Sequence, residues 1–246
     1  MLCLKTNNKQ EHSIKQLKFE EMKTTKKMML FVATLFVATF ALSSCLSDDN
    51  ETKKPTVEEQ AGYQRTMAGT YGSTLRFFYP LFNNAVKYDS LKHYSFDVTA
   101  DSTITMRDFP VCKLDSAIVI SKDNHSDSAV EFAALRTAIH ESNATAKLTA
   151  KYFVPYDKCV IEYGYSFLVL PMTIKQSFFY NGKSHDVYFM FDISGSCGGK
   201  FLSSNFTDRV FEYTMVLSGI CVDKYSAEGL IPTQYFRQVL ITSTTK

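Results

Sequence analysis

The sequence of 246 residues contains no tryptophan, and it lacks the G-x-S-x-G motif of many serine hydrolases and the H-E-x-x-H motif of zinc proteases. It also has no C-x-x-C pair. The four cysteines that follow residue 45 are separated by 47, 38 and 24 residues, which argues against a structural zinc site. The sequence therefore predicts no metal, no cofactor and no recognisable catalytic centre.

The apolar run 28–42 is too short to cross a bilayer, because a spanning helix needs about 20 apolar residues. Its fifteen residues carry no charge and have the length of a signal-peptide core. Three lysines stand before it (Lys23, Lys26 and Lys27), and Leu42-Ser43-Ser44-Cys45 ends it. This order resembles a bacterial lipoprotein signal. The resemblance implies cleavage before Cys45 and attachment of a palmitate-type lipid to its sulfur; an ordinary secretory signal is the alternative.

Residues 1–21 are polar and of mixed charge, so we interpret them as a mis-called start that precedes a true start at Met22. The predicted organisation is then a mis-called start (1–21), a signal peptide (22–44), an acidic tether (45–55) and a single β-rich domain (56–246). The acidic stretch Ser47, Asp48 and Asp49 resembles the export signal of Bacteroidetes surface lipoproteins. That resemblance implies a lipid anchor in the outer membrane facing the cell surface, and a plain solvated linker is the alternative.

The formal charge is nearly balanced once the leader is set aside. Residues 1–44 hold seven of the 27 basic and three of the 25 acidic residues, which leaves 20 basic and 22 acidic residues. A chain without basic excess has no stripe that could follow a phosphate backbone, so nucleic acid is excluded as an expected partner.

Alternating apolar and polar residues predict a mainly antiparallel β fold, either a β-sandwich or a calycin-like barrel, with nine or ten strands and two or three short helices. A capping box, Thr56 with Glu59, predicts a helix that ends near Met67. Asn181-Gly182 lies between two apolar runs and predicts a tight hairpin.

Three further elements are predicted from local patterns. Ser128 and Glu131 form a second capping box, which opens a helix, and 112–120 is expected to contain one or two helical turns. Val160 to Leu170 is almost uniformly apolar and is expected to be one central strand, with Glu162 at an edge or pointing outward.

The segment Met67-Ala68-Gly69-Thr70-Tyr71 resembles the opening of lipocalin-like (calycin) barrels, where a short helix precedes a Gly-x-aromatic on the first strand. Tyr71 stands where that family has Trp, and the helical insert near 113–140 also departs from its simple meander. In general character the chain resembles uncharacterised Bacteroidales lipoproteins of about 200 residues. That resemblance implies no activity.

Residues that could carry chemistry are scattered. His93, His125, His140 and His185 each lack a spaced partner, and we expect all four at the surface. The stretch 194–200 lacks the glycine and hydroxyl residue of a phosphate loop and is interpreted as a flexible turn. Glu141, Glu162 and Glu212 are available as paired acids for a hydrolase, but no sequence pattern distinguishes them. Cys112, Cys159, Cys197 and Cys221 could form two disulfides in three pairings or remain thiols, and we favour buried thiols.

Aromatic residues are abundant, with 20 Phe and 14 Tyr. In the two strands around Asn181-Gly182, Phe179, Tyr188 and Met190 fall on the face opposite their apolar neighbours. A face that should be polar but is apolar is a candidate binding patch, and coverage by the predicted helices is the alternative.

Four Asp-Ser pairs in a forty-residue stretch match an Asp-Ser/Thr-apolar pattern that resembles Bacteroidetes O-glycosylation sites. Ser90, Ser102 and Ser116 are the candidates for modification, because Ser128 is assigned to the helix cap. Asp-Ser also favours turns, which is the alternative explanation.

Taken together, the sequence predicts a lipid-anchored cell-envelope protein that is a non-enzymatic binding module for a glycan, an apolar ligand or an envelope partner. A surface hydrolase with paired carboxylates and a structural envelope protein are the alternatives.

Overall fold

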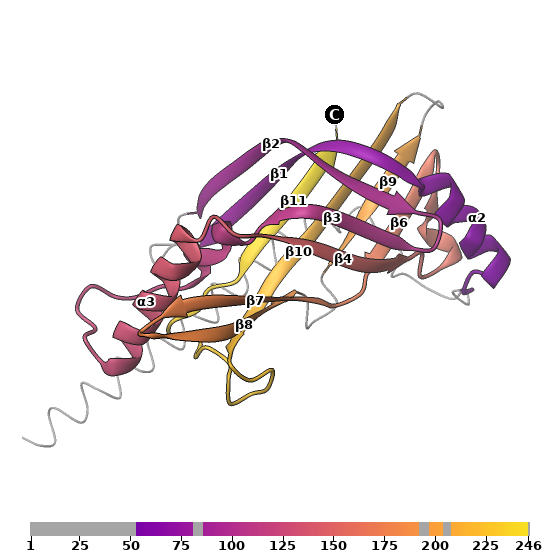
Figure 1. The fold of residues 1–246 in the computed structure, drawn as a ribbon. Coiled ribbons are helices and arrows are strands. Elements are labelled where there is room, and N and C mark those ends of the chain that lie inside the picture. Colours follow the sequence, from indigo (N-terminus) through magenta and orange to yellow (C-terminus); the bar gives the residue numbers. More distant parts are fainter. Residues whose placement is uncertain (1–52, 81–85, 192–196, 204–207, 246) are drawn as a thin grey trace, which may run out of the picture. The chain divides into compact units, whose positions relative to one another are not determined.

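The last strand of the chain pairs with the first. In the computed structural model, β11 (Val239–Thr245) lies antiparallel to β1 (Gly69–Pro80) on one edge and to β10 (Arg209–Val222) on the other. This double pairing closes eight strands, in the order β11-β1-β2-β3-β4-β6-β9-β10, into a barrel (Figure 1). The fold is therefore the predicted antiparallel β class, and of the two architectures left open it is the barrel.

The structure describes residues 53–80, 86–191, 197–203 and 208–245. The predicted signal peptide, the lipidation site Cys45 and the export signal Ser47, Asp48 and Asp49 lie outside these residues. Every element described below lies in one compact unit, Glu51–Lys246. Among the described residues, no helix has the length and apolar character needed to cross a membrane.

In the described part of the chain, two α-helices and two short 3-10 helices accompany the strands. The remaining elements are α2 (Val57–Met67), β2 (Val86–Thr99), β3 (Thr103–Pro110), η1 (Val111–Ala117), α3 (Asp127–Glu141), β4 (Thr145–Phe153), η2 (Asp157–Cys159), β5 (Val160–Ile161), β6 (Gly164–Val169), β7 (Met172–Tyr180), β8 (Lys183–Phe191) and β9 (Gly198–Ser203).

The β7–β8 hairpin extends the sheet beyond the barrel. Residues 209–214 of β10 pair with β9, and residues 217–222 pair with β8, so the long strand β10 serves both partners in succession. The hairpin turns at Asn181 and Gly182, whose φ angles of 49° and 80° are those of the tight turn predicted from their sequence. Its inner face packs near α3 at one end of the domain (Figure 1).

The barrel interior around Phe211 is filled by aromatic rings. The ring centroid of Phe211 lies 4.8 Å from that of Phe167, 5.0 Å from that of Tyr71 and 5.5 Å from that of Phe96. All four side chains are buried. Offset and tilted rings at these distances form a packed core, so this level of the barrel is occupied by the protein's own side chains.

The helix α2 and the start of β1 follow the sequence prediction closely. The Thr56 hydroxyl accepts a hydrogen bond from the Glu59 amide at 3.2 Å, and the Glu59 carboxylate accepts one from the Thr56 amide at 2.7 Å, which completes the capping box. The Tyr71 hydroxyl then donates to the Met67 carbonyl at 2.6 Å. The Arg209 guanidinium lies over the Tyr71 ring, 5.4 Å from its centre, and covers this end of the core.

Three element predictions were wrong in detail. The described residues form eleven strands, where nine or ten were predicted. The cap of α3 is Ser126, not Ser128, because Ser126 accepts from the Ala129 amide and is also held by the Tyr235 hydroxyl, 3.1 Å away. The apolar stretch 160–170 is two strands, β5 and β6, which pair with each other across a turn at Glu162 and Tyr163. Glu162 is exposed in that turn and therefore needs no buried partner. The predicted helical turns at 112–120 are η1.

Cys112, Cys159, Cys197 and Cys221 are all thiols that form no disulfide with one another, as favoured from the sequence. Cys197 and Cys221 are buried, whereas Cys112 and Cys159 are partly exposed. Desolvation raises the pKa of the Cys221 thiol, so this thiol is a poor nucleophile.

Candidate functional site

The β7–β8 hairpin has a buried inner face and an accessible outer face. Phe179, Tyr188 and Met190 all belong to the outer face, but the register separates them. Phe179 faces Ser184 near the turn and is 71% exposed. Tyr188 faces Lys175 and Met190 faces Thr173. The side chains of Tyr188 and Met190 are both half-buried. The structure therefore brings Tyr188 and Met190 together and leaves Phe179 apart.

The segment 223–231, not a helix, partly covers this outer face. It places Tyr225, which is 61% exposed, beside Tyr188 with ring centroids 5.5 Å apart and ring planes inclined by 44°. The Tyr225 hydroxyl lies 3.3 Å from the Thr173 hydroxyl. We call Thr173, Lys175, Tyr188, Met190 and Tyr225 the tyrosine face. Sequence reasoning missed Tyr225 because it lies in a loop, where no periodicity reveals a neighbour.

Charged groups border the tyrosine face. The Lys175 ammonium lies 2.7 Å from the Asp186 carboxylate and 5.5 Å from the centre of the Tyr188 ring. Ser177 also donates to Asp186 at 2.7 Å. The hydrogen bond between Lys175 and Asp186 lowers the pKa of Asp186 and raises the pKa of Lys175, so both groups are charged at neutral pH. The face thus combines two aromatic rings with a fixed cation, a fixed anion and hydroxyl groups.

His185 lies in β8, and its side chain is buried on the inner face of the hairpin. This corrects the expectation that His185 lies at the surface. Its side chain is 3% exposed, and its Nδ1 lies 2.9 Å from the Asp223 carboxylate. Because a carboxylate can only accept, Nδ1 carries the proton. The Asp223 carboxylate also accepts a hydrogen bond from the Asp186 amide at 3.1 Å, and the Asp223 amide donates one to the Asp186 carbonyl at 2.7 Å. These bonds fasten the start of the segment that carries Tyr225.

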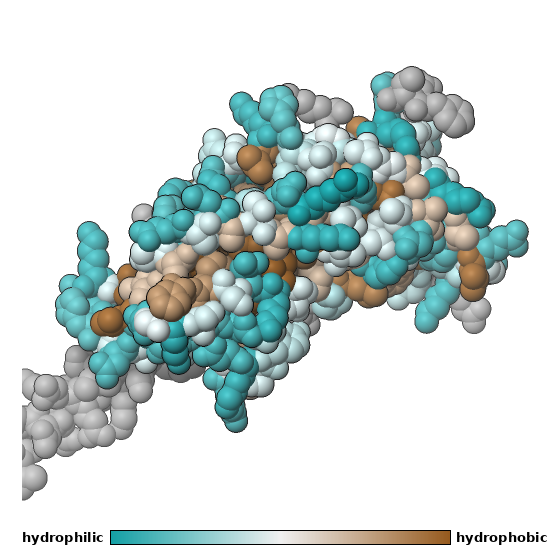
Figure 2. Space-filling view, in the orientation of Figure 1, coloured by the Kyte–Doolittle hydropathy of each residue, from teal (hydrophilic) through white to brown (hydrophobic). Residues whose placement is uncertain are grey.

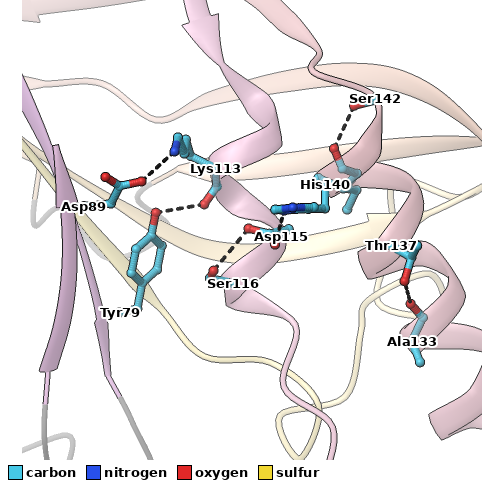
Figure 3. A network of polar contacts seen from close by, with 10 residues as sticks. Tyr79, Asp89, Lys113, Asp115, Ser116, Ala133, Thr137, His140 and Ser142 are labelled. Atoms are coloured by element: carbon cyan, nitrogen blue, oxygen red, sulfur yellow. Dashed lines mark hydrogen bonds and ion pairs between the residues drawn. The ribbon is translucent and has the colours of Figure 1, made fainter. Parts of the chain in front are cut away.

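A second polar cluster lies between η1, α3 and the β1–β2 pair (Figure 3). His140 Nδ1 lies 3.0 Å from the Asp115 carboxylate, and the Ser116 hydroxyl donates to the same carboxylate at 3.1 Å. In a nucleophile-activating triad the serine bonds to the imidazole instead. This order of contacts therefore orients His140 but does not activate Ser116. The His140 side chain is 72% exposed at the end of α3, as expected for a surface histidine.

The same cluster contains an ion pair. The Lys113 ammonium donates to the Asp89 carboxylate at 2.6 Å, and the Tyr79 hydroxyl donates to the Lys113 carbonyl at 3.1 Å (Figure 3). The Lys113 hydrogen bond lowers the pKa of Asp89, and the same bond raises the pKa of Lys113. These contacts connect η1 to β1 and β2, so the ion pair and the tyrosine hydroxyl have a structural role.

The glycine-rich stretch is not a flexible turn throughout. Residues 192–196 lie outside the described residues, but Gly198 and Gly199 belong to β9. A Cβ on Gly199 would lie 2.0 Å from the Glu212 carbonyl oxygen, so glycine permits close packing of β9 on β10. No phosphate loop is built from this strand.

The carboxylates considered for hydrolysis lie on separate elements. Glu141 ends α3, Glu162 lies in the β5–β6 turn and Glu212 lies in β10. All three are exposed. Across the described part of the chain, no group of three or more His, Cys, Asp and Glu side chains could hold a metal ion.

The three candidate serines differ in their surroundings. Ser90 is exposed in β2, and its amide donates to the Asp89 carboxylate at 2.7 Å. Ser102 lies in the β2–β3 turn with φ of 62°, and its hydroxyl donates to the Asp101 carbonyl at 2.6 Å. Ser116 is held by Asp115 in the second cluster. Ser90 is therefore the most accessible of the three.

Comparison with known proteins adds a family. Residues 66–222, from the end of α2 through β10, match the family described as "Domain of unknown function (DUF4840)". The match includes the β7–β8 hairpin with Tyr188 and stops just before Tyr225. No curated protein and no solved structure matches the chain significantly. Because the matched residues make up more than half of the chain, the protein belongs to the DUF4840 family.

Proposed function

We propose that the protein is a lipid-anchored component of the cell envelope that binds a glycan through the tyrosine face. The anchor is supported by the sequence order before Cys45, and Ser47, Asp48 and Asp49 support placement on the cell surface of a Bacteroidetes-type outer membrane. Glucose-like sugars have apolar faces that stack on aromatic rings and hydroxyl edges that bond to charged groups. The ligand is therefore recognised by stacking and hydrogen bonding, without catalysis.

The observation that carries this proposal is the contact between Tyr188 and Tyr225. The two rings lie side by side on the outside of the domain, and two charged groups, Lys175 and Asp186, lie 2.7 Å apart beside Tyr188. An aromatic pair of this kind supplies contact area at little entropic cost, since each ring has only two side-chain torsions. Aromatic side chains fill the barrel around Phe211, so we expect a ligand to bind on the outside of the barrel.

Figure 2 supports an interaction role for the same end of the domain. Brown, apolar surface is visible among the polar residues where Figure 1 places α3 and the β7–β8 hairpin. The exposed apolar side chains of these two elements include Val130 and Phe179. Phe179 lies on the outer side of the hairpin and could extend the contact of a long ligand beyond Tyr188.

The test is binding of envelope and plant glycans to the purified protein, first on an array and then by calorimetry. Tyr225→Ala and Tyr188→Ala are each expected to weaken binding by about two- to tenfold, because a stacked ring contributes on the order of 0.5–1.5 kcal/mol. Tyr88→Ala is the matched control, since Tyr88 is 67% exposed on β2 and lies outside the face. Binding that survives loss of both rings would contradict the proposal.

A hydrolase remains the second candidate because of one observation, the His140–Asp115 pair with its exposed imidazole. A histidine oriented by a carboxylate can act as a general base. Release of reducing sugar from a glycan, or of carboxylic acid and alcohol from an ester, abolished by His140→Ala, would favour this function over binding. Modification of Ser90 is tested separately, by the mass of the protein from its native host compared with that of Ser90→Ala.

A further inference from the structure

An exposed apolar patch lies at the end of the domain where the tether leaves. It consists of Tyr156, Val160, Tyr163 and Leu202, whose exposed fractions are 39, 41, 63 and 38%. We call these four residues the exit patch. They come from the segment before η2, the β5–β6 hairpin and the neighbouring strand β9.

Backbone pairing places the residues of the exit patch next to one another at the ends of neighbouring strands. Gly164, the residue after Tyr163, pairs with Leu202, and the Ser203 amide donates to the Tyr163 carbonyl at 2.7 Å. Val160 lies at the other side of the same two-residue turn. Val160 pairs with Tyr165 and Leu202 pairs with Gly164, so these two side chains point to opposite faces of the sheet, and the exit patch comprises side chains on both faces at this end of the domain.

Tyr163 is held in an unfavourable backbone conformation. Its φ angle is 70°, in the left-handed region that bulky residues rarely adopt. The β7–β8 hairpin, by contrast, uses Asn181 and Gly182 at its turn, as steric rules favour. A tyrosine in place of glycine is unfavourable for folding, and this makes its exposed ring a candidate for a role in binding.

The tether begins at this patch. The Asp157 amide, next to Tyr156, donates to the carbonyl of Lys53 at 3.0 Å. Lys53 is eight residues after Cys45, the predicted lipid attachment site. Covalent geometry limits eight residues to about 28 Å even when fully extended. With the lipid in place, the tether holds this end of the domain within about 28 Å of the bilayer.

The composition of the exit patch fits the headgroup region of a membrane. Tyrosine is enriched at that depth because it joins an apolar ring to a polar hydroxyl. Exposed Lys53, Lys54 and Lys158 surround the patch, and exposed Asp157 and Glu162 nearly balance their charge. Contact is therefore driven by the aromatic and aliphatic side chains and not by attraction to anionic lipids.

We propose that the exit patch rests in the headgroup layer of the bilayer and so fixes the orientation of the lipid-anchored domain. This inference rests on the proposed anchor. Figure 1 shows α2 and β6 at one end of the domain and α3 at the other. With the exit patch on the membrane, the end that carries α3 and the β7–β8 turn is directed away from the bilayer, toward soluble or neighbouring ligands.

The absence of tryptophan gives a direct test, because a single introduced tryptophan is the only indole in the chain. The lipidated full-length protein with Tyr163→Trp is reconstituted into phosphatidylethanolamine–phosphatidylglycerol vesicles that contain brominated lipid. We expect blue-shifted emission and loss of intensity through bromine quenching. Val160→Trp provides a second reporter if Tyr163→Trp does not fold.

The control is Tyr88→Trp. Tyr88 pairs with Phe78 near the end of β1, whereas the start of β1, next to α2, pairs with Val98. Tyr88 therefore lies far from α2. The variant is expected to show neither effect. Flotation of the protein with the vesicles reports the anchor separately. Flotation without quenching of the Tyr163→Trp and Val160→Trp variants would overturn the exit patch alone, and a blue shift without bromine quenching would assign the patch to a protein contact. Loss of flotation would overturn the anchor and, with it, the exit patch.

Discussion

The ring Nδ1 of His185 donates a hydrogen bond to the Asp223 carboxylate across 2.9 Å, and this bond joins the two halves of the tyrosine face. His185 lies in β8, two residues before Val187 and on the buried side of the hairpin. Asp223 begins the segment that carries Tyr225. Tyr188 and Tyr225 therefore depend on a polar contact beneath the sheet for their relative position.

His185→Ala is expected to lower the free energy of unfolding by about 2–4 kcal/mol, through loss of the hydrogen bond and of a buried ring. His140→Ala is the matched control. It removes a similar His–Asp contact, but its side chain is 72% exposed, so the expected cost is below about 1 kcal/mol. Urea unfolding followed by circular dichroism measures both.

A reporter distinguishes local from global loss. In a Tyr225→Trp background, His185→Ala is expected to increase iodide quenching of the indole under conditions where the barrel stays folded. Unchanged quenching would mean that Asp223 holds the segment through its bonds to Asp186 alone.

The Asp89–Lys113 ion pair predicts a small pH dependence of stability. The pKa of Asp89 is lowered in the folded state, so its contribution is present above the pKa of the unfolded carboxyl and is lost as the pH falls through the folded pKa. The pKa of Lys113 is raised, so its contribution is lost only at strongly alkaline pH. Both side chains are more than a third exposed, which limits the effect to below about 1 kcal/mol. Asp89→Asn is expected to flatten the stability profile below pH 4, and an unaltered slope would show that other carboxyls dominate.

Gly199→Ala is expected to destabilise the barrel by about 3 kcal/mol or more, because its Cβ would lie 2.0 Å from the Glu212 carbonyl oxygen and strands β9 and β10 would have to separate. Gly72→Ala is the control, since nothing lies within 4 Å of a Cβ placed there. Thermal unfolding of the two variants gives the comparison. Equal melting temperatures would show that β9 can shift without cost.

Sequence reasoning located most elements whose signals are local. The Thr56–Glu59 capping box and the Asn181–Gly182 turn depend on neighbours in the chain, and both were predicted. Closure of the sheet depends on β11 pairing with β1, and the tyrosine face depends on a loop returning to β8. These contacts join residues far apart in sequence, where periodicity carries no information. The same limit explains the error on His185, whose partner is 38 residues away.

Tyr163→Gly tests whether Tyr163 lowers the stability of the β5–β6 turn while it provides contact with a membrane. Glycine adopts a φ of 70° without the steric cost that tyrosine has, so the variant is expected to gain about 1 kcal/mol in free energy of unfolding. The hydroxyl and ring are 63% exposed, so little packing is lost. The same variant is expected to lose the membrane contact of the exit patch, measured as weaker bromine quenching of a Val160→Trp reporter in vesicles. A variant that is more stable and still fully quenched would show that the strained tyrosine serves another purpose, whereas a less stable variant would show that its ring packs against the barrel.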